Sequence, residues 1–452
     1  AMFHADNAYF LPSVAIRSRR LKTDTVSNTA FRGFGGPQGM LGIERVMDAI
    51  AIAVGRDPLD VRRDNLYGGP GRDVTPYGMT VENSHMPAIL DELEATSDYR
   101  ARVAAVDAFN AGSRFLKKGI ALTPVKFGIS FTLMPLNQAG ALVHVYSDGS
   151  IHLNHGGTEM GQGLFIKVAQ VVAEVFGVPV DFVRVTATST AKVPNTGPTA
   201  ASSGTDLNGM AAKNAAETIR GRLAAFAAGR FACALDDVVF ADGWVSAGNE
   251  RMTFGELAHV ATQARVSLSS TGFYATPKIS WDRANVRGRP FYYFAYGASC
   301  SEVTIDTLTG EMRVDRVDVL HDVGNSLNPA IDIGQIEGGF VQGMGWLTAE
   351  ELVYDEAGRL RTHAPSTYKI PTATDVPADF RVRLFEGGGN AEETVFRSKA
   401  VGEPPLMLPI SVFSAITRAI GSLRPGTLPP LDAPATPEAI RRAVKAMQGR
   451  AP

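Results

Sequence analysis

Residues 141–177 read ALVHVYSDGSIHLNHGGTEMGQGLFIKVAQVVAEVFG, and this stretch decides the fold. Two runs of alternating apolar residues flank Ser147-Asp148-Gly149-Ser150, and Asp-Gly between such runs is a strong hairpin signal. The glycine-rich loop 156–163 follows, and then a predicted helix that ends at Gly177 and has its apolar residues on one face, namely Leu164, Val168, Val171 and Val175. The stretch therefore predicts a hairpin, a glycine loop and a helix in succession.

The same succession recurs later in the chain. Apolar runs at 301–305 and 312–320 flank Thr309-Gly310, a Gly/Asn loop covers 322–328, and a glycine-containing helical segment comes next. The repeat predicts a duplicated unit within an α+β fold, with mixed sheets and packed helices.

Helical periodicity marks the regions on either side of these units. We expect helices at 40–54, at 58–66, over 86–110 and near 408–420, and a strand over 119–132. The Ala111-Gly112-Ser113 break suggests two domains, 1–115 and 116–452, with 231–256 as a peripheral insertion.

The composition bounds the class of protein. The chain has 452 residues, 45% hydrophobic and 20% charged, with a net charge of -2, which suits a folded protein with a sizeable core. We expect neither a nucleic-acid nor a membrane partner, because the charges are interspersed and apolar runs such as 49–54 are short. The two cysteines, Cys233 and Cys300, cannot ligate an iron–sulfur cluster here, and they suit a cytoplasmic protein.

Familiar cofactor motifs are absent. Gln38 and Ile166 stand where a dinucleotide loop needs its third glycine, and the chain has no P-loop. His152 and His155 are three apart on one strand, so they face opposite sides and do not form a metal site.

The remaining candidates for a functional site are loops of glycine and other small residues, and a few isolated side chains. Gly161-Gln162-Gly163 at a helix start and the small residues of 198–204 can hold an anion through backbone N–H groups, or can simply be tight turns; together they favour a bulky anionic cofactor. Glu403, between Gly402 and Pro404-Pro405, is either a catalytic carboxylate or a helix-start residue. Phe34 and Phe131 are either platforms for a flat ligand or core residues.

Seven segments together resemble the xanthine dehydrogenase family. They cover nearly the whole chain in order and lie at 29–38, 126–132, 156–163, 198–202, 326–335, 365–371 and 399–405. The resemblance implies a molybdopterin whose dithiolene holds molybdenum, so that no side chain ligates the metal. It divides the chain into the C-terminal part of a first molybdopterin-binding domain (1–115) and a second such domain (116–452).

The resemblance also assigns roles to individual residues. Glu403 matches the general base, which takes a proton from the oxygen nucleophile that attacks a purine. Burial would raise its pKa and a nearby helix start would lower it. The other matched residues are Phe34 and Phe131, which sandwich the purine; Thr132, which hydrogen-bonds it; and Arg32, Gln162, Ala200, Ala201 and Ser202, which contact the cofactor.

Departures from the family pattern imply partners. A substrate-site Glu has no match here, the corresponding Arg would directly precede Ala1, and the 2Fe-2S and FAD parts are absent. We therefore expect the C-terminal piece of a molybdenum subunit, in an oligomeric complex with the upstream piece and an iron–sulfur/FAD subunit that passes electrons to NAD. The expected reaction is xanthine or hypoxanthine hydroxylation to urate; the alternatives are an aldehyde oxidase, a hydroxylase of another N-heterocycle, or a non-catalytic assembly module.

Overall fold

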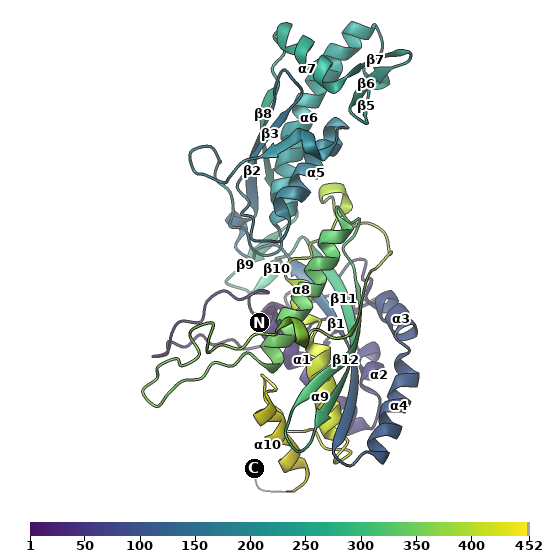
Figure 1. The fold of residues 1–452 in the computed structure, drawn as a ribbon, viewed down its shortest axis with the longest axis vertical. Helices are drawn as coiled ribbons and strands as arrows, with labels where there is room; N and C mark the ends of the chain where they lie inside the picture. The colour runs from purple at the N-terminus through teal and green to yellow at the C-terminus, as the bar shows by residue number, and fades with distance from the viewer. Residues whose placement is uncertain (450–452) are drawn as a thin grey trace.

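In the computed structural model, which describes residues 1–449, the two longest strands pair at the centre of the lower lobe (Figure 1). These are β1 (Leu116–Ile129) and β11 (Tyr293–Asp306), which run antiparallel. β12 (Met312–His321) pairs antiparallel with β11, and β13 (Asp379–Leu384) runs parallel to β12, giving the order β1-β11-β12-β13. Nearly every residue of β1 and β11 is buried, because helices cover both faces of this sheet.

Each face of the lower sheet has its own hydrophobic core. On one face pack α8 (Pro329–Thr348), α9 (Ile410–Gly421) and α10 (Pro437–Met447). On the other lie α2 (Pro58–Asp64), α3 (Met86–Thr96) and α4 (Tyr99–Gly112), while α1 (Gly36–Val54) contributes to both cores. Strand β1 and helix α9 lie so close that a Cβ at Gly119 would be 1.9 Å from the Ala415 carbonyl oxygen.

The upper lobe of Figure 1 is a second sheet with two long helices on one face. Its order is β4-β3-β2-β8, with β2 (Gln138–Val145), β3 (Ile151–His155), β4 (Val183–Val185) and β8 (Ser269–Ala275). The covering helices are α5 (Leu164–Phe176) and the alanine-rich α6 (Gly204–Phe231). Small residues let α6 approach the sheet, since a Cβ at Gly272 would be 2.0 Å from the Ala211 carbonyl oxygen.

Small elements complete the fold. The predicted insertion 231–256 forms the sheet β5 (Val239–Ala241), β6 (Trp244–Ala247) and β7 (Glu250–Thr253), and leads into α7 (Phe254–Gln263). β9 (Ser280–Asp282) pairs with β10 (Arg287–Arg289). Short 3₁₀ turns are η1 (Met2–His4), η2 (Met134–Leu136), η3 (Val180–Phe182), η4 (Leu235–Asp237), η5 (Ala373–Asp375), η6 (Val395–Arg397) and η7 (Pro404–Met407).

The structure confirms the predicted α+β fold and its repeated unit. β2, β3, the glycine loop and α5 form one copy, and β11, β12, the loop after β12 and α8 form the other. One expected element differs: the helix over 86–110 is two helices, α3 and α4, because the chain breaks at Asp98 (φ 54°). The domain division at residue 115 stays a prediction.

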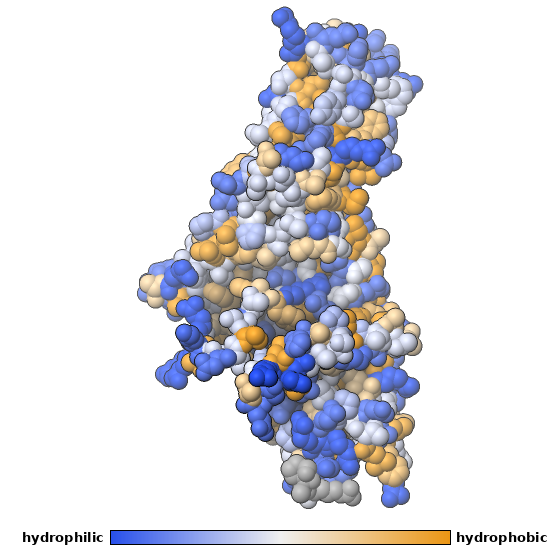
Figure 2. Space-filling view, turned by 60° about the vertical axis from the view of Figure 1, so that its left-hand side comes forward, coloured by the Kyte–Doolittle hydropathy of each residue, from blue (hydrophilic) through white to orange (hydrophobic). Residues whose placement is uncertain are grey.

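The surface is mixed in character. Figure 2 shows hydrophobic residues in separate patches among hydrophilic ones. Within the described residues, the stretch Pro404–Gly421 is long and apolar enough to cross a membrane, but 89% of it is buried, as in the core helix of a folded domain.

Candidate active site

Glu403 lies at the start of η7, but its carboxylate does not cap that turn. Instead Oε1 accepts a hydrogen bond from the backbone N–H of Gly33 (3.1 Å), and Oε2 accepts one from Ser202 Oγ (2.8 Å). Ser202 Oγ also accepts from the backbone N–H of Glu403 (2.8 Å). The carboxylate is therefore fixed between two loops, and this geometry does not support the alternative role of stabilising a helix start.

Arg32 fixes the same loop from the other side. Its Nε donates to the Gly402 carbonyl (2.6 Å) and its Nη1 to Gln342 Oε1 on α8 (3.0 Å). Its Nη2 is buried and has no hydrogen-bond partner within residues 1–449. A bound group with acceptor atoms would satisfy this nitrogen.

The pKa of Glu403 is raised, and the main cause is burial. The Ser202 and Gly33 hydrogen bonds and the Arg32 charge act in the opposite direction but do not outweigh burial. Burial, one of the two effects expected from the sequence, therefore sets the direction of the pKa shift. A raised pKa makes the ionised carboxylate a stronger proton acceptor, which suits a general base.

The loop before α1 presents Phe34 to the surface. Phe34 has a φ of 46° and is 76% exposed, between Gly33 (φ 87°) and Gly35 (φ 94°). Gly36 packs against the end of β1, since a Cβ there would be 2.7 Å from the Phe127 ring. These glycines let the backbone turn sharply, so that an aromatic ring and the Glu403 partner Gly33 share one loop.

Phe131 and Thr132 follow β1 directly and are half-buried. Asn137 holds Phe131 in place, because the Phe131 N–H donates to Asn137 Oδ1 (2.8 Å) and Asn137 Nδ2 donates to the Phe131 carbonyl (2.9 Å). Among the described residues, neither the Phe34 nor the Phe131 ring stacks on another aromatic ring. The Phe34 ring is exposed, and the Phe131 ring is partly so.

The loop before α6 forms a small cradle. Ala201 (φ 54°) and Ser202 (φ 57°) are both left-handed, and their backbone N–H groups meet no acceptor in the part of the chain described. Consecutive N–H groups in such turns make a concave site for acceptor atoms. Ala200, the preceding residue, donates its N–H to the Pro198 carbonyl (2.9 Å).

The glycine loop before α5 differs from the sequence expectation. The anion on its N–H groups is the side chain of Glu159, whose Oε1 accepts from Gly161 (2.9 Å) and Gly163 (3.1 Å) and whose Oε2 accepts from Phe165 (3.0 Å). Gln162 is engaged within the same turn: its Nε2 donates to the Thr158 carbonyl (2.7 Å) and its Oε1 accepts from the backbone N–H of Met160 (2.5 Å). A phosphate at this helix start would have to displace Glu159.

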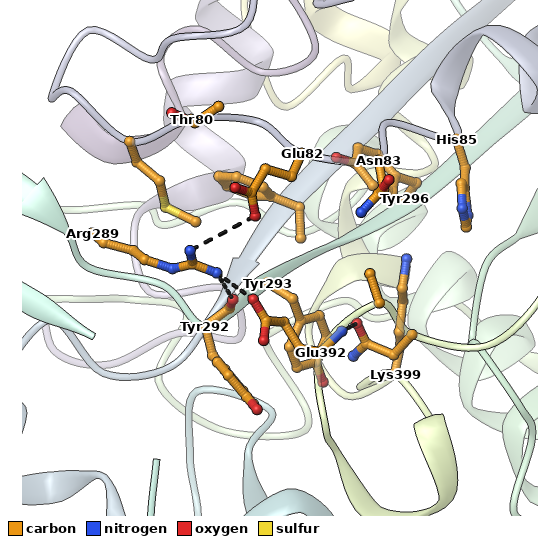
Figure 3. Close-up of a pocket in the computed structure, with 14 residues that line it drawn as sticks. Thr80, Glu82, Asn83, His85, Arg289, Tyr292, Tyr293, Tyr296, Glu392 and Lys399 are labelled. Carbon is orange, nitrogen blue, oxygen red and sulfur yellow. Dashed lines mark hydrogen bonds and ion pairs between the residues drawn. The ribbon is translucent and has the colours of Figure 1, made fainter. Parts of the chain in front are cut away.

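Figure 3 shows a separate pocket that contains none of the predicted site residues. Its charged side chains are paired: Arg289 Nη2 lies 2.5 Å from Glu392 Oε1, and Lys399 Nζ lies 2.5 Å from Asp322 Oδ2. Lys399 is four residues before Glu403, so the pocket borders the loop that carries the candidate base without including it.

Family models match most of the chain. Residues 92–377 and 1–66 match two models that are each described as a molybdopterin cofactor-binding domain. The chain belongs to the molybdopterin cofactor-binding domain family. This confirms the predicted family resemblance and the predicted cofactor class.

Relatives of this family extend well beyond the chain. It is 47% identical to the xanthine dehydrogenase/oxidase of Felis catus over 450 residues, 98% of this chain and 32% of the relative. It is 47% identical to the xanthine dehydrogenase of Dictyostelium discoideum over 427 residues, 94% of this chain and 30% of the relative. The chain thus spans about a third of the length of these relatives.

Solved structures of the family share the fold. Quinoline 2-oxidoreductase from Pseudomonas putida 86 has a TM-score of 0.80 at 26% identity, over 92% of this chain and 53% of that one. The aldehyde oxidoreductase from Desulfovibrio gigas has a TM-score of 0.72 at 26% identity, over 92% and 42%.

The residues present fit a molybdopterin. Within residues 1–449, no group of three or more His, Cys, Asp or Glu side chains could hold a metal ion. The unpartnered Arg32 Nη2 and the cradle at Ala201 and Ser202 offer donors to such an acceptor-rich ligand.

Two residues of the site were not among the predicted site residues. Gly33 and Gln342 take part through contacts that join positions 310 to 370 residues apart. A sequence pattern read along the chain shows local spacing only, so their roles become visible when the fold brings α8 and the loop before α1 together.

Proposed function

We propose that this chain supplies the general base and part of the cofactor site of a xanthine dehydrogenase, which hydroxylates xanthine or hypoxanthine to urate. The observation that carries the proposal is the pair of hydrogen bonds that Gly33 and Ser202 donate to the half-buried Glu403 carboxylate. Identity of 47% to xanthine dehydrogenases over nearly the whole chain supports the purine as substrate class. Intact Glu403, Arg32 and Phe34 count against a non-catalytic assembly module.

The proposed cofactor contacts come from three loops. Arg32 through Nη2, and Ala201 and Ser202 through their backbone N–H groups, would hold acceptor atoms of the molybdopterin, with Ala200 beside them. Gln162 would join them once its amide leaves its own turn. The bound molybdenum supplies a Lewis acid and a two-electron sink.

The proposed substrate contacts lie beside these loops. Phe34 and Phe131 would flank the flat purine, and Thr132 would hydrogen-bond to it. Glu403 accepts a proton at the carboxylate from the attacking oxygen nucleophile, and its raised pKa favours holding that proton. The Gly33 N–H and Ser202 hydroxyl keep the carboxylate oriented during the transfer.

We propose that the remaining steps belong to other parts of the protein. The chain covers 32% of its cat relative, which leaves room for an upstream molybdopterin piece and for 2Fe-2S and FAD parts that carry electrons to NAD. An oligomeric complex in the cytoplasm is proposed on the same resemblance.

The test is xanthine-dependent NAD⁺ reduction by the complete protein that contains this chain, with Glu403→Gln as the variant. We expect turnover in the wild type and a fall of at least about a thousandfold in the variant, since it loses the base but keeps a similar shape. Molybdenum content should be equal in both. Turnover of a different heterocycle or an aldehyde, with none of xanthine, would replace the purine assignment; wild-type rates in the variant would remove Glu403 as the base.

A further inference from the structure

The loop that carries Glu403 is anchored at successive residues. Lys399 donates its backbone N–H to the Val323 carbonyl (2.7 Å), and the Gly402 carbonyl accepts from Arg32 (2.6 Å). Between these anchors, the backbone N–H of Ala400 donates to the hydroxyl oxygen of Tyr293 on β11 (2.9 Å). Among the described residues, the Tyr293 hydroxyl is the acceptor for the Ala400 N–H.

Two residues near the start of α6 interact with the same loop, one directly and one through Tyr293. Ser202, just before the helix, binds Glu403 directly. Asp206, four residues later, accepts a hydrogen bond at Oδ2 from the Tyr293 hydroxyl (2.7 Å). Tyr293 thus links Asp206 to Ala400, three residues before Glu403.

The direction of these two hydrogen bonds follows from which groups carry a hydrogen to donate. Ala400 N–H can only donate, so the Tyr293 oxygen must accept there and direct its own hydrogen to Asp206. Asp206 and Tyr293 are 7% and 5% exposed, so an unmade bond at either would leave a buried polar group unsatisfied. We propose that Asp206 and Tyr293 are positioning residues, which fix the peptide at Ala400 and thereby the aim of the Glu403 carboxylate.

The surroundings of Asp206 are mostly neutral. Tyr293 and Tyr292 of β11, Tyr274 of β8 and Lys167 of α5 face this region, and Lys167 is itself paired with Asp332 of α8. Burial raises the pKa of Asp206 to about 7, because it outweighs the Tyr293 hydrogen bond and the Lys167 charge. Protonated at one oxygen, Asp206 would still accept from Tyr293 at the other, so the positioning role does not require its charge.

The chain offers a matched control three residues further along β11. Tyr296 is 1% exposed, as buried as Tyr293, but its hydroxyl faces Ser84 and makes no hydrogen bond to the Glu403 loop in the described structure. Figure 3 shows Tyr293 and Tyr296 lining the same pocket beside Lys399. Replacing either by Phe removes one buried hydroxyl, but only Tyr293→Phe breaks a link to the Glu403 loop.

The experiment compares Tyr293→Phe, Asp206→Ala, Asp206→Asn and Tyr296→Phe in the complete holoenzyme. Amide hydrogen exchange is followed by mass spectrometry in the peptide covering 398–403, together with kcat and KM for xanthine. In Tyr293→Phe and Asp206→Ala we expect exchange at least fivefold faster and kcat about tenfold lower, with KM within twofold. Asp206→Asn keeps an acceptor and should stay near the wild type, as should Tyr296→Phe.

The results separate this proposal from the proposed function on which its rate measurement rests. Exchange in 398–403 that is no faster in Tyr293→Phe than in Tyr296→Phe overturns the positioning pair, whatever the substrate. If Tyr293→Phe does not fold, Asp206→Ala decides by the same comparison. Absence of xanthine turnover in the wild type overturns the proposed function alone, because the exchange measurement still decides the positioning role.

Discussion

Ser202 is the residue on which the state of Glu403 depends most directly. One hydroxyl accepts from the Glu403 backbone N–H and donates to its carboxylate, each at 2.8 Å. A hydrogen bond to the ionised form lowers a carboxyl pKa, so this contact opposes the rise that burial causes. Ser202→Ala should therefore raise the pKa of Glu403 further and leave its side chain less firmly held.

The measurement is kcat/KM for xanthine as a function of pH. A general base works when ionised, so activity falls as the pH drops through the raised pKa of Glu403. In Ser202→Ala this acid limb should move to higher pH, and the rate on the plateau should fall about tenfold. Ser203→Ala is the control, because the Ser203 hydroxyl bonds only within its own turn, to the Ala200 carbonyl (3.2 Å). An acid limb that does not move would contradict the role given to Ser202.

At the residue scale, Glu403 could be predicted as a candidate site residue from the sequence, but the residues that contact it could not. The glycine before it and the two prolines after it mark a stiff backbone, which is a local signal. Its partners Gly33 and Ser202 lie 370 and 201 positions away. Local sequence therefore left the catalytic and helix-start roles open, and the hydrogen bonds of the folded chain count against the helix-start role.

At the scale of elements, α8 packs against the Glu403 loop and η7 through glycines, among them Gly339 and Gly343. A Cβ at Gly339 would lie 2.6 Å from Pro405 Cβ and 3.1 Å from Arg32 Nη2, whereas a Cβ at Gly338 would meet nothing within 4 Å. Gly339→Ala should push η7 and Arg32 away from α8 and lower turnover and cofactor content together. Gly338→Ala should leave both unchanged and raise stability by about 0.5–1 kcal/mol, as Ala does in a helix interior.

Molybdenum content, xanthine turnover and the unfolding midpoint of the two variants test this difference. The substitutions are identical in chemistry and adjacent in sequence, so any general effect of Ala on α8 appears in both. Equal behaviour of Gly338→Ala and Gly339→Ala would show that the contact between α8 and η7 does not matter for the site.

The glycine loop before α5 makes a second prediction at this scale. Glu159 accepts three backbone N–H groups at the helix start, and these bonds lower its pKa below the ordinary 4.5. A carboxylate with a lowered pKa stabilises the fold above its unfolded pKa, and this contribution is lost as the pH falls through the lowered value. Glu159→Ala should cost about 1 kcal/mol at pH 7 and much less in acid below the lowered pKa.

Denaturant unfolding at neutral and acid pH measures this contribution. Glu174→Ala is the control, since Glu174 is exposed near the opposite end of α5, away from the N–H groups of the glycine loop. An equal loss at both pH values in Glu159→Ala would mean that the charge at the helix start is not the cause.

Most helices and strands could be predicted from the sequence because their signals are local. The Asp-Gly turn at 148–149 and the glycine after α5 mark the ends of β2, β3 and α5, and the structure has them there. The break between α3 and α4 was missed because helical periodicity continues on both sides of Asp98, whose left-handed φ of 54° is not marked by a Gly or Pro. The sequence did not predict which anion accepts from the N–H groups of the loop before α5. That anion is the side chain of Glu159, which belongs to the loop itself.

At the scale of the whole molecule, the site lies where the two lobes meet. Ser202 and Asp206 come from the upper lobe, while Glu403, Arg32 and Tyr293 come from the lower one (Figure 1). Hydropathy periodicity predicts each lobe separately, because each has its own buried strands and helices. It does not predict how the lobes pack, because the contacts between them, polar and apolar, join residues that are distant in the sequence.

One such contact is the buried ion pair between Lys167 of α5 and Asp332 of α8. Their side chains are 9% and 4% exposed, and Asp332 also accepts from Ser326 Oγ (2.5 Å). Removing one partner leaves an unpaired buried charge, which costs about 3–5 kcal/mol, whereas replacing both partners by neutral groups is often nearly harmless. Lys167→Met should therefore be strongly destabilising, and Lys167→Met with Asp332→Asn should recover most of the loss.

Urea unfolding and molybdenum content of the complete protein test whether this pair only joins the lobes or has a further role at the site. If it only joins the lobes, the double variant should regain both stability and cofactor, because the amide that replaces the Asp332 carboxylate would be neutral and could still accept from Ser326. The single variant should lose cofactor as the lobes separate, since the proposed ligand contacts at Arg32 and Ser202 come from opposite lobes. A single variant as stable as the double one would show that the pair does not hold the lobes together, and other contacts between them, such as those of Ser202 with Glu403 and of Tyr293 with Asp206, would then have to fix the site.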